Sequence, residues 1–243
     1  MDNTTLVTLS RQDAMRRSMD VIANNMANLN TTAYKTETVL FEQYMTDVEM
    51  EDGSTEQVSL VHDYGNLRNT SEGSFYETGS DLDVAIRGDG YLVTQTPEGE
   101  QRFTRNGSLS IDQTGQLVAR SGEPVLDSDN NPIIMGDQDH HLTISKDGSI
   151  STDAGPKGSL KVVSFENEQM MFKTGSGTYK TEEVPIPAEG ITLVQGMLER
   201  SNVSSILEMT KMIDVSRAYM SAAKAMETNG QLVQKAINEL AAV

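Results

Sequence analysis

Apolar side chains recur at helical spacing near the start of the chain. Met15, Met19, Ile22, Met26 and Leu29 follow one another in steps of four, three, four and three residues. Residues at this spacing share one face of an α-helix, so the pattern predicts an amphipathic helix that ends within residues 24–35.

A longer pattern near the C-terminus follows a heptad repeat, with eight of nine seam positions apolar and one asparagine. The positions are Met212, Val215, Tyr219, Ala222, Met226, Asn229, Val233, Ala236 and Leu240. We predict a helix over residues 204–242, about 58 Å long at roughly 1.5 Å per residue. Both stripes are narrow, and neither helix is expected to have much else in its own chain to pack against. The simplest arrangement pairs the two as a coiled coil, although ordinary core packing is the alternative for either stripe alone.

Between the two ends the period of the pattern changes to two. From about residue 74, runs such as "LDVAI" and "YLVTQ" alternate apolar and polar residues, and glycines seven to nine residues apart separate them. This spacing predicts antiparallel hairpins in a meander, followed by a loop-rich segment over residues 167–195. We therefore expect an α+β fold with three parts: a discontinuous helical coiled-coil domain (1–35 and 200–243), an intervening segment (36–73), and a β-rich domain (74–199).

The intervening segment is strongly acidic. Residues 36–67 hold eight Asp and Glu residues and no Lys or Arg. We interpret it as a solvated linker or an extended arm.

Charge and composition narrow the possible functions. The chain has 243 residues, a formal net charge of −17 and a pI near 4.5, which argues against nucleic-acid binding. It has no apolar run long enough to span a membrane, and residues 1–30 lack the features of a cleaved secretory signal. Cysteine is absent, so disulfides and thiolate sites are excluded.

Candidate catalytic and metal-binding patterns are weak. "SAAK", "SDN" and "KTG" occur in serine β-lactamases and penicillin-binding proteins, but here "SAAK" comes last instead of first. "DSDNNP" resembles the start of a calcium loop with Pro132 where glycine is needed, and "DQDHH" offers adjacent histidines that a strand would point to opposite faces. We expect no catalytic residues, no cofactor and no metal.

Three blocks of sequence share a pattern with one protein family. They read "ANNMANLNTTAYK", "GDGYLVTQTPEGEQRFTRNGSLSIDQTGQLV" and "QGMLERSNVSSILEMTKMIDVSRAYMSAAKAME". In this order they resemble the signatures of bacterial flagellar rod and hook proteins. One departure is Ala33, which stands where the family usually has glycine, so a turn that needs positive φ there must be made another way.

The resemblance implies a structural subunit of the basal-body rod, an axial drive shaft that transmits motor torque. It implies a helical domain built from both termini, self-association into a tube, and contacts with other proximal and distal rod subunits and the hook side. It also implies passage through the flagellar type III export apparatus without a cleaved signal, to a rod in the periplasmic space, with no membrane insertion. The length and the single β domain favour the proximal or the distal rod protein, and "MDNTTLVTLSRQDAMRRSMDVIANN" is more similar to the proximal one.

Four asparagines, Asn24, Asn25, Asn28 and Asn30, crowd the end of the first helix. Asn24 and Asn28 share one face, and we interpret them as bonding across helix or subunit interfaces to fix register, as Asn229 does in the C-terminal seam. The alternative is that Asn28, Asn30 and Thr31 cap the helix end.

The residues expected at assembly interfaces come from these seams and blocks. They are Met15, Met19, Ile22, Asn24, Asn25, Met26, Asn28, Leu29, Asn30, Tyr34, Lys35, Ser201, Asn202, Met209, Met212, Val215, Arg217, Tyr219, Met226, Asn229, Val233 and Leu240. Two other classes stay open: a secreted β-domain binding module on a coiled-coil stalk, and a penicillin-recognising acylase.

Overall fold

The computed structural model describes residues 3–49, 55–136, 139 and 141–240, and the chain divides into two compact units. The first, which we call the helix–hairpin unit, contains Met1–Leu29, Thr36–Asn69 and Val203–Val243. The second, the β unit, contains Asn30–Lys35 and Thr70–Asn202. The chain therefore begins in the helix–hairpin unit, enters the β unit for residues 30–35, and returns to the helix–hairpin unit for residues 36–69. Residues 70–202 then form the rest of the β unit, and the C-terminal segment completes the helix–hairpin unit.

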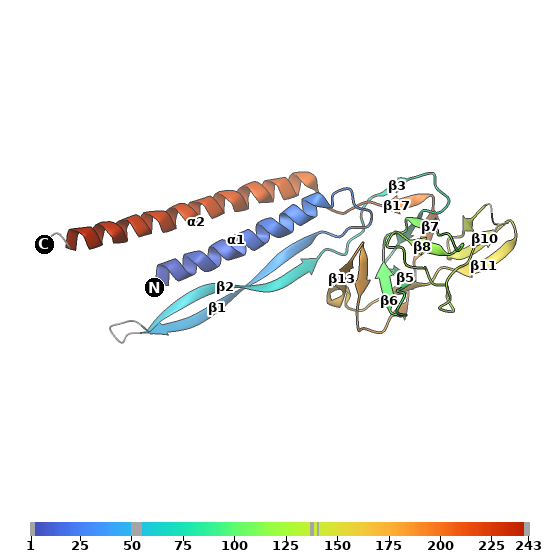
Figure 1. Cartoon of the computed structure of the whole chain (residues 1–243), viewed down its shortest axis with the longest axis horizontal. Coiled ribbons are helices and arrows are strands. Elements are labelled where there is room, and N and C mark those ends of the chain that lie inside the picture. The colour runs from blue at the N-terminus through green and yellow to red at the C-terminus, as the bar shows by residue number, and fades with distance from the viewer. Residues whose placement is uncertain (1–2, 50–54, 137–138, 140, 241–243) are drawn as a thin grey trace. The chain divides into compact units, whose positions relative to one another are not determined.

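Two helices form most of the helix–hairpin unit, as the apolar spacing predicts. Helix α1 spans Asn3–Ala27 and α2 spans Ser205–Leu240. They pack against each other and run antiparallel, so that the end of α1 lies beside the start of α2 (Figure 1). No helix in the described ranges is long and apolar enough to cross a membrane.

The acidic segment is a long β-hairpin. Of the two interpretations given above, this corrects the solvated linker and is compatible with the extended arm. Strands β1 (Glu37–Glu49) and β2 (Thr55–Arg68) pair antiparallel from Glu37↔Arg68 onward, with a bulge at Leu40/Phe41. Both strands also pack against α1, so this helix has a second partner that the apolar stripes did not predict. The segment is also rich in β-branched and aromatic residues, which favour strands, and the interpretation from charge did not take them into account. A hairpin with one face in solvent can carry many acidic side chains on that face.

The β unit consists of short antiparallel strands, as predicted. Its main sheet has the order β13-β14-β6-β5-β12-β15. Its elements are β3 (Phe75–Glu77), β4 (Val84–Arg87), β5 (Tyr91–Gln95), β6 (Gln101–Thr104), β7 (Leu109–Ile111), β8 (Leu117–Ala119), β9 (Thr143–Ile144), β10 (Ser149–Thr152), β11 (Gly155–Ser159), β12 (Val162–Ser164), the 3-10 turn η1 (Glu168–Met170), β13 (Phe172–Gly175), β14 (Thr178–Lys180), β15 (Ile186–Pro187), β16 (Thr192–Gln195) and β17 (Met197–Glu199). The segment 167–195 is thus less loop-rich than expected, because it supplies both edge strands of this sheet.

The core lies in the β unit. One cluster of buried aliphatic residues includes Ile86, Leu92 and Leu117. A second cluster is aromatic, with Phe103 and Phe165 in edge-to-face contact at a 4.8 Å centroid distance. Such well-packed clusters supply most of the hydrophobic stabilisation of a domain.

Candidate functional site

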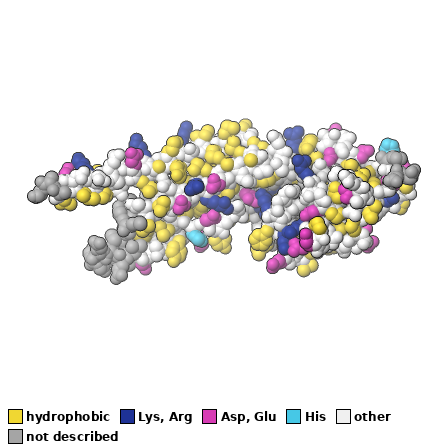
Figure 2. Space-filling model, viewed as in Figure 1, with side chains coloured by type: hydrophobic (Ala, Val, Ile, Leu, Met, Phe, Trp, Pro, Cys, Tyr) yellow, Lys and Arg dark blue, Asp and Glu magenta, His cyan; other side chains and the backbone are white. Residues whose placement is uncertain are grey.

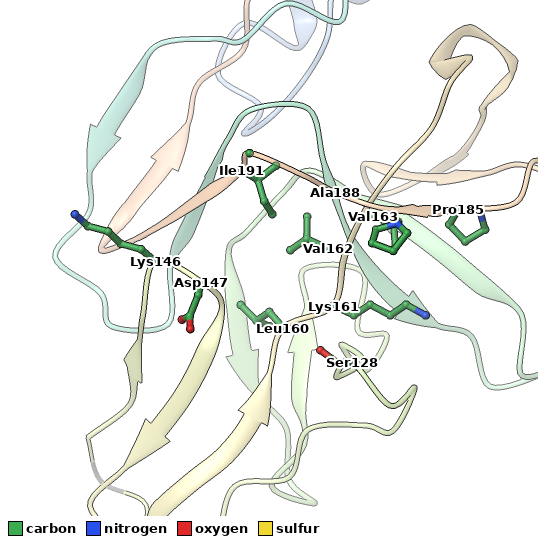
Figure 3. Close-up of a pocket in the computed structure, with 12 residues that line it drawn as sticks. Ser128, Lys146, Asp147, Leu160, Lys161, Val162, Val163, Pro185, Ala188 and Ile191 are labelled. Atoms are coloured by element: carbon green, nitrogen blue, oxygen red, sulfur yellow. The ribbon is translucent and has the colours of Figure 1, made fainter.

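A groove in the β unit offers little chemistry. It encloses about 580 Å³ between the turn that carries Lys146 and Asp147, the start of β12, and residues 185–191 (Figure 3). Lys146 and Lys161 extend in opposite directions (Figure 3). The Asp147 carboxylate accepts hydrogen bonds from the backbone N–H and hydroxyl of Ser149. No polar groups converge on one point, so the groove does not suggest an active site.

Metal binding and acyl transfer find no support in the described structure. Among the described residues no three His, Asp or Glu side chains gather as a metal site, and Gln138 and His140 lie outside those residues. Ser221 belongs to the helix–hairpin unit, whereas Ser128 and Lys173 belong to the β unit. The three penicillin-type patterns therefore do not share one compact unit.

The most unusual chemistry is a buried ion cluster in the β unit. Glu199, at the end of β17, accepts a hydrogen bond from Lys35 Nζ on Oε1 at 2.7 Å and from Arg105 Nε on Oε2 at 2.6 Å. All three residues are at least 96 % buried, with exposed fractions of 2 % or 4 %. Charged side chains are rarely buried unless paired, so this pairing is a requirement of the fold.

Backbone groups satisfy most of the remaining polar atoms of the cluster. Lys35 Nζ also donates to the Ser71 carbonyl at 2.7 Å, and the Gly73 N–H donates to Glu199 Oε1 at 2.8 Å. Arg105 donates to the carbonyls of Gly90 and Ile86. The guanidinium also contacts the carboxylate of Glu72 at 3.3 Å, which itself accepts a hydrogen bond from the N–H of Gly88.

The electrostatics identify Glu199 as the central member. Burial lowers the pKa of Lys35 below its ordinary value, while the charge of Glu199 opposes that shift. Burial also acts to lower the pKa of Arg105, but Glu199 outweighs it and the pKa is raised. Nearby, burial raises the pKa of Tyr91 and of Glu168, whose side chains are hydrogen-bonded to each other. Glu199 therefore favours the charged forms of both cations inside a poorly solvated site.

The cluster joins all three sequence blocks. Lys35 ends "ANNMANLNTTAYK", Arg105 lies in "RFTRNG", and Glu199 lies in "QGMLERSNV". Backbone bonds reinforce the junction, because the Ala33 N–H donates to the Glu199 carbonyl at 2.9 Å and the Asn202 N–H donates to the Tyr34 carbonyl at 3.2 Å. Sequence reasoning selected Lys35 but missed Arg105 and Glu199, although both lie in the sequence blocks that carry the family resemblance.

Ala33 takes the left-handed conformation at this junction, with φ of 57°. The family's usual glycine would adopt that angle freely, whereas alanine is strained there by roughly 1–2 kcal/mol. The backbone of this chain therefore forms the left-handed turn with alanine and is strained at that residue.

A second polar tie lies in the helix–hairpin unit. The buried Asn25 side chain donates to the Glu37 carbonyl at 2.8 Å and to Glu208 Oε2 at 2.9 Å, and accepts from the Glu37 N–H at 3.0 Å. Lys211 Nζ holds the other oxygen of Glu208 at 2.7 Å. Asn25 thus connects α1, β1 and α2. Of the four asparagines, the interpretation singled out Asn24 and Asn28. The Asn28 side chain, just past the last residue of α1, donates to the Asn24 carbonyl at 2.8 Å.

The structure distributes the expected interface residues over three environments. Three are buried: Ile22, Asn25 and Lys35. Thirteen are half-buried: Met15, Met19, Met26, Asn28, Leu29, Tyr34, Ser201, Asn202, Met212, Val215, Tyr219, Met226 and Asn229. Six are exposed: Asn24, Asn30, Met209, Arg217, Val233 and Leu240. Five of these residues belong to the β unit and not to the helices: Asn30, Tyr34, Lys35, Ser201 and Asn202.

The C-terminal part of α2 extends beyond the start of α1. Asn25 lies opposite Glu208, and Ser18 and Ile22 share a small cavity with Lys211 and Val215. Continuing this antiparallel register places the start of α1 opposite about residue 230. Every residue from Gln231 to Leu240 is accordingly exposed. We call this segment the α2 overhang.

Helix α2 also exposes apolar side chains on the face turned away from α1. Ile206, Met209, Ile213 and Met220 are 47–79 % exposed and recur at helical spacing. Hydrophobic side chains gather over the N-terminal half of α2 in Figure 2. We call these four residues the outer stripe. A contiguous apolar surface of this kind marks an interaction site in soluble proteins.

Three protein-family models match the chain. "Flagella basal body rod protein" matches residues 6–35, "Flagellar hook protein FlgE/F/G D1 domain" matches residues 85–152, and "Flagellar basal body rod FlgEFG protein C-terminal" matches residues 194–239. They cover most of both helices and the middle of the β unit.

Full-length relatives agree with these matches. The chain is 37 % identical to the flagellar basal-body rod protein FlgF of Caulobacter vibrioides, over 99 % of this chain and 98 % of that protein. It is 31 % identical to FlgF of Mesorhizobium japonicum, with the same coverage. It is also 31 % identical to the rod protein FlgG of Bacillus subtilis, over 95 % of this chain and 96 % of that protein.

Proposed function

This chain belongs to the family of flagellar hook and basal-body rod proteins, most like FlgF, and we propose that it polymerises through its terminal helices into the axial rod. It is a structural subunit, and its relatives are structural proteins rather than enzymes. The finer proposal is that α1 and α2 pair as a coiled coil and that neighbouring subunits complete the surfaces that this pair leaves open.

The observation that carries the proposal is the α2 overhang. Val233, Ile237 and Leu240 are 51–78 % exposed. Val233 and Leu240 continue the heptad seam beyond the residues that α1 covers, and Ile237 is next to the seam position Ala236. An isolated helix of this length gains little stability without tertiary packing, so an apolar overhang favours a partner. A helix from a neighbouring subunit is the partner that extends the same seam.

The remaining parts of the proposal, which are the other binding partners, the export route and the location, follow from membership of the rod-protein family. The proposal includes contacts with other proximal and distal rod subunits and with the hook side, export by the flagellar type III apparatus without a cleaved signal, and a periplasmic location. Flagellar basal-body relatives support this location, and the absence of a membrane-crossing helix among the described residues is compatible with it. A rigid polymer of such subunits would transmit torque from the motor.

Deletion of the gene, with complementation by variants, tests the proposal. We expect the deletion strain to make basal bodies without a completed rod and to be non-motile. The triple variant Val233→Gln, Ile237→Gln, Leu240→Gln replaces the two large seam residues of the overhang and the neighbouring Ile237 with a good helix former. It should secrete the subunit but fail to restore rods, as judged by electron microscopy of purified basal bodies.

A matched control changes the polar positions of the same segment. Gln231→Ala, Gln234→Ala and Lys235→Ala should restore rods and swimming, because these residues lie off the heptad seam. Complete rods and normal motility with the Gln triple variant would contradict assembly through the overhang.

A further inference from the structure

We propose that the cluster of Lys35, Arg105 and Glu199 is a closing latch, through which the β unit becomes stable only when segments from both ends of the chain are seated in it. The inference goes beyond the role of a rod subunit, because it concerns how one subunit closes and not how subunits meet.

The first argument is topological. The β unit takes Asn30–Lys35 from before the hairpin and Thr70–Asn202 from after it. Lys35 and Glu199 are 164 residues apart in sequence, and Arg105 and Glu199 are 94 apart. Glu199 belongs to the last strand of the unit, β17, whose partner β3 opens the second segment. The cluster therefore forms only after the last strand has returned to the first.

The second argument concerns charge. Without Glu199, the buried site holds two cations that repel each other, since Arg105 itself acts to lower the pKa of Lys35. The remaining carboxylate contact of Arg105, Glu72, is more exposed, with 38 % of its side chain accessible. Leaving a buried ion without its partner is strongly destabilising. A chain that lacks a seated Glu199 must keep this part of the β unit open to water.

The third argument concerns packing at the same place. Gly73 approaches the chain that follows Glu199 so closely that a Cβ on it would lie 2.0 Å from the Arg200 carbonyl oxygen. The Arg200 N–H donates to the Ser74 carbonyl, and Asn202 Nδ2 donates to the Ser71 carbonyl. The segment 199–202 therefore lies over residues 71–74 and covers the ions.

The latch has a consequence for the order of events. Residues 70–198 contain nearly all of the apolar core, yet they lack both Lys35 and the carboxylate that neutralises Arg105. A chain whose C-terminal part has not been made, or is held elsewhere, retains an open β unit. Closure then brings residues 30–35, where the chain first enters the β unit, together with residues 199–202, where it leaves, in a single step.

Hydrogen exchange of the full chain, followed by mass spectrometry of peptides, tests the latch. Glu199→Gln preserves shape and removes the charge. We expect exchange to accelerate on the order of 100-fold throughout the β unit, including β4, β5 and β10, while α2 residues 205–230 change little. The control Glu100→Gln removes a surface carboxylate that pairs with Arg102 and Lys180, and it should change exchange less than about threefold.

A second variant keeps the proposal testable if Glu199→Gln does not fold. Lys35→Met removes the N-terminal member and leaves the pair of Arg105 and Glu199 intact. It should accelerate exchange in the same core strands as well as in residues 30–35. Acceleration confined to residues 30–35 and 197–202, in either variant, would overturn the latch and leave the cluster as a local contact.

Discussion

The two units of this chain differ in how completely they bury their own apolar side chains. The β unit encloses two hydrophobic clusters and a paired set of ions. The helix–hairpin unit buries only Val21, Ile22 and Val58 among its described apolar residues, and it carries most of the large exposed ones. The β unit buries its apolar side chains within the chain, whereas the helix–hairpin unit leaves apolar surfaces open to a neighbouring molecule.

The difference follows from shape and element type. Short antiparallel strands fold over one another and enclose a core, whereas two helices and a two-stranded hairpin have few layers and leave outer faces bare. The outer stripe and the α2 overhang are these bare faces. Under the proposed assembly, the apolar side chains that this unit leaves exposed are where neighbouring subunits pack.

The largest effect should come from deleting core atoms, and it should separate the two units. Leu117 is fully buried in the β unit, and Leu117→Ala should lower that unit's free energy of unfolding by about 3 kcal/mol through lost burial and a cavity. Val233→Ala in the α2 overhang should cost no more than about 0.5 kcal/mol in the monomer. Chemical denaturation of the monomer, with hydrogen exchange to assign each unit, measures both.

One result would contradict this difference between the two units. If Val233→Ala destabilises the isolated monomer as much as Leu117→Ala does, the overhang is already packed in the monomer.

An intermediate effect is expected at Asn25, which ties the helix–hairpin unit together. Asn25→Ala removes three hydrogen bonds and leaves the buried Glu208 with one fewer donor, so it should destabilise that unit by about 2 kcal/mol. Faster hydrogen exchange in α1 and β1, with the β unit unaffected, is the expected result.

The matched control for Asn25 changes the exposed Asn24 and the half-buried Asn28 together. Asn24→Ala with Asn28→Ala should leave exchange in the monomer nearly unchanged, but should impair rod assembly if these amides bond between subunits. Normal rods in that double variant would remove the interface role proposed for them, whatever the outcome at Asn25.

The smallest effect should be a gain in stability at Ala33. Ala33→Gly relieves the left-handed strain and should stabilise the β unit by about 0.5–1 kcal/mol, less than the full strain because glycine adds freedom to the unfolded chain. Ala85→Gly, in the buried strand β4, is the control and should destabilise by about 1 kcal/mol. Opposite signs in thermal melts support the strain, and a loss of stability in both would argue against it.

The sequence predicted more of the architecture than of the sites. Helical spacing around Met19 and Met212 located both helices, and alternation from residue 74 located the antiparallel strands. The acidic composition of residues 36–67 favoured a solvated linker, whereas the segment forms a hairpin. Net charge indicates how well a segment is solvated, but it does not indicate whether its backbone pairs with another strand. Cross-strand partners such as Glu37 and Arg68 are 31 residues apart, and no local pattern shows that they meet.

The sequence by itself determined the fold class, the division into helical ends and a β-rich middle, and the family, since local periodicity and short motifs carry that information. Only the tertiary structure decided that Lys35, Arg105 and Glu199 share one buried site, that Asn25 rather than Asn24 bridges three elements, and that the last turns of α2 lack a partner within the described chain. Each of these depends on which distant residues come within a few ångströms, and burial and pairing of charge are properties of that arrangement and not of any one segment.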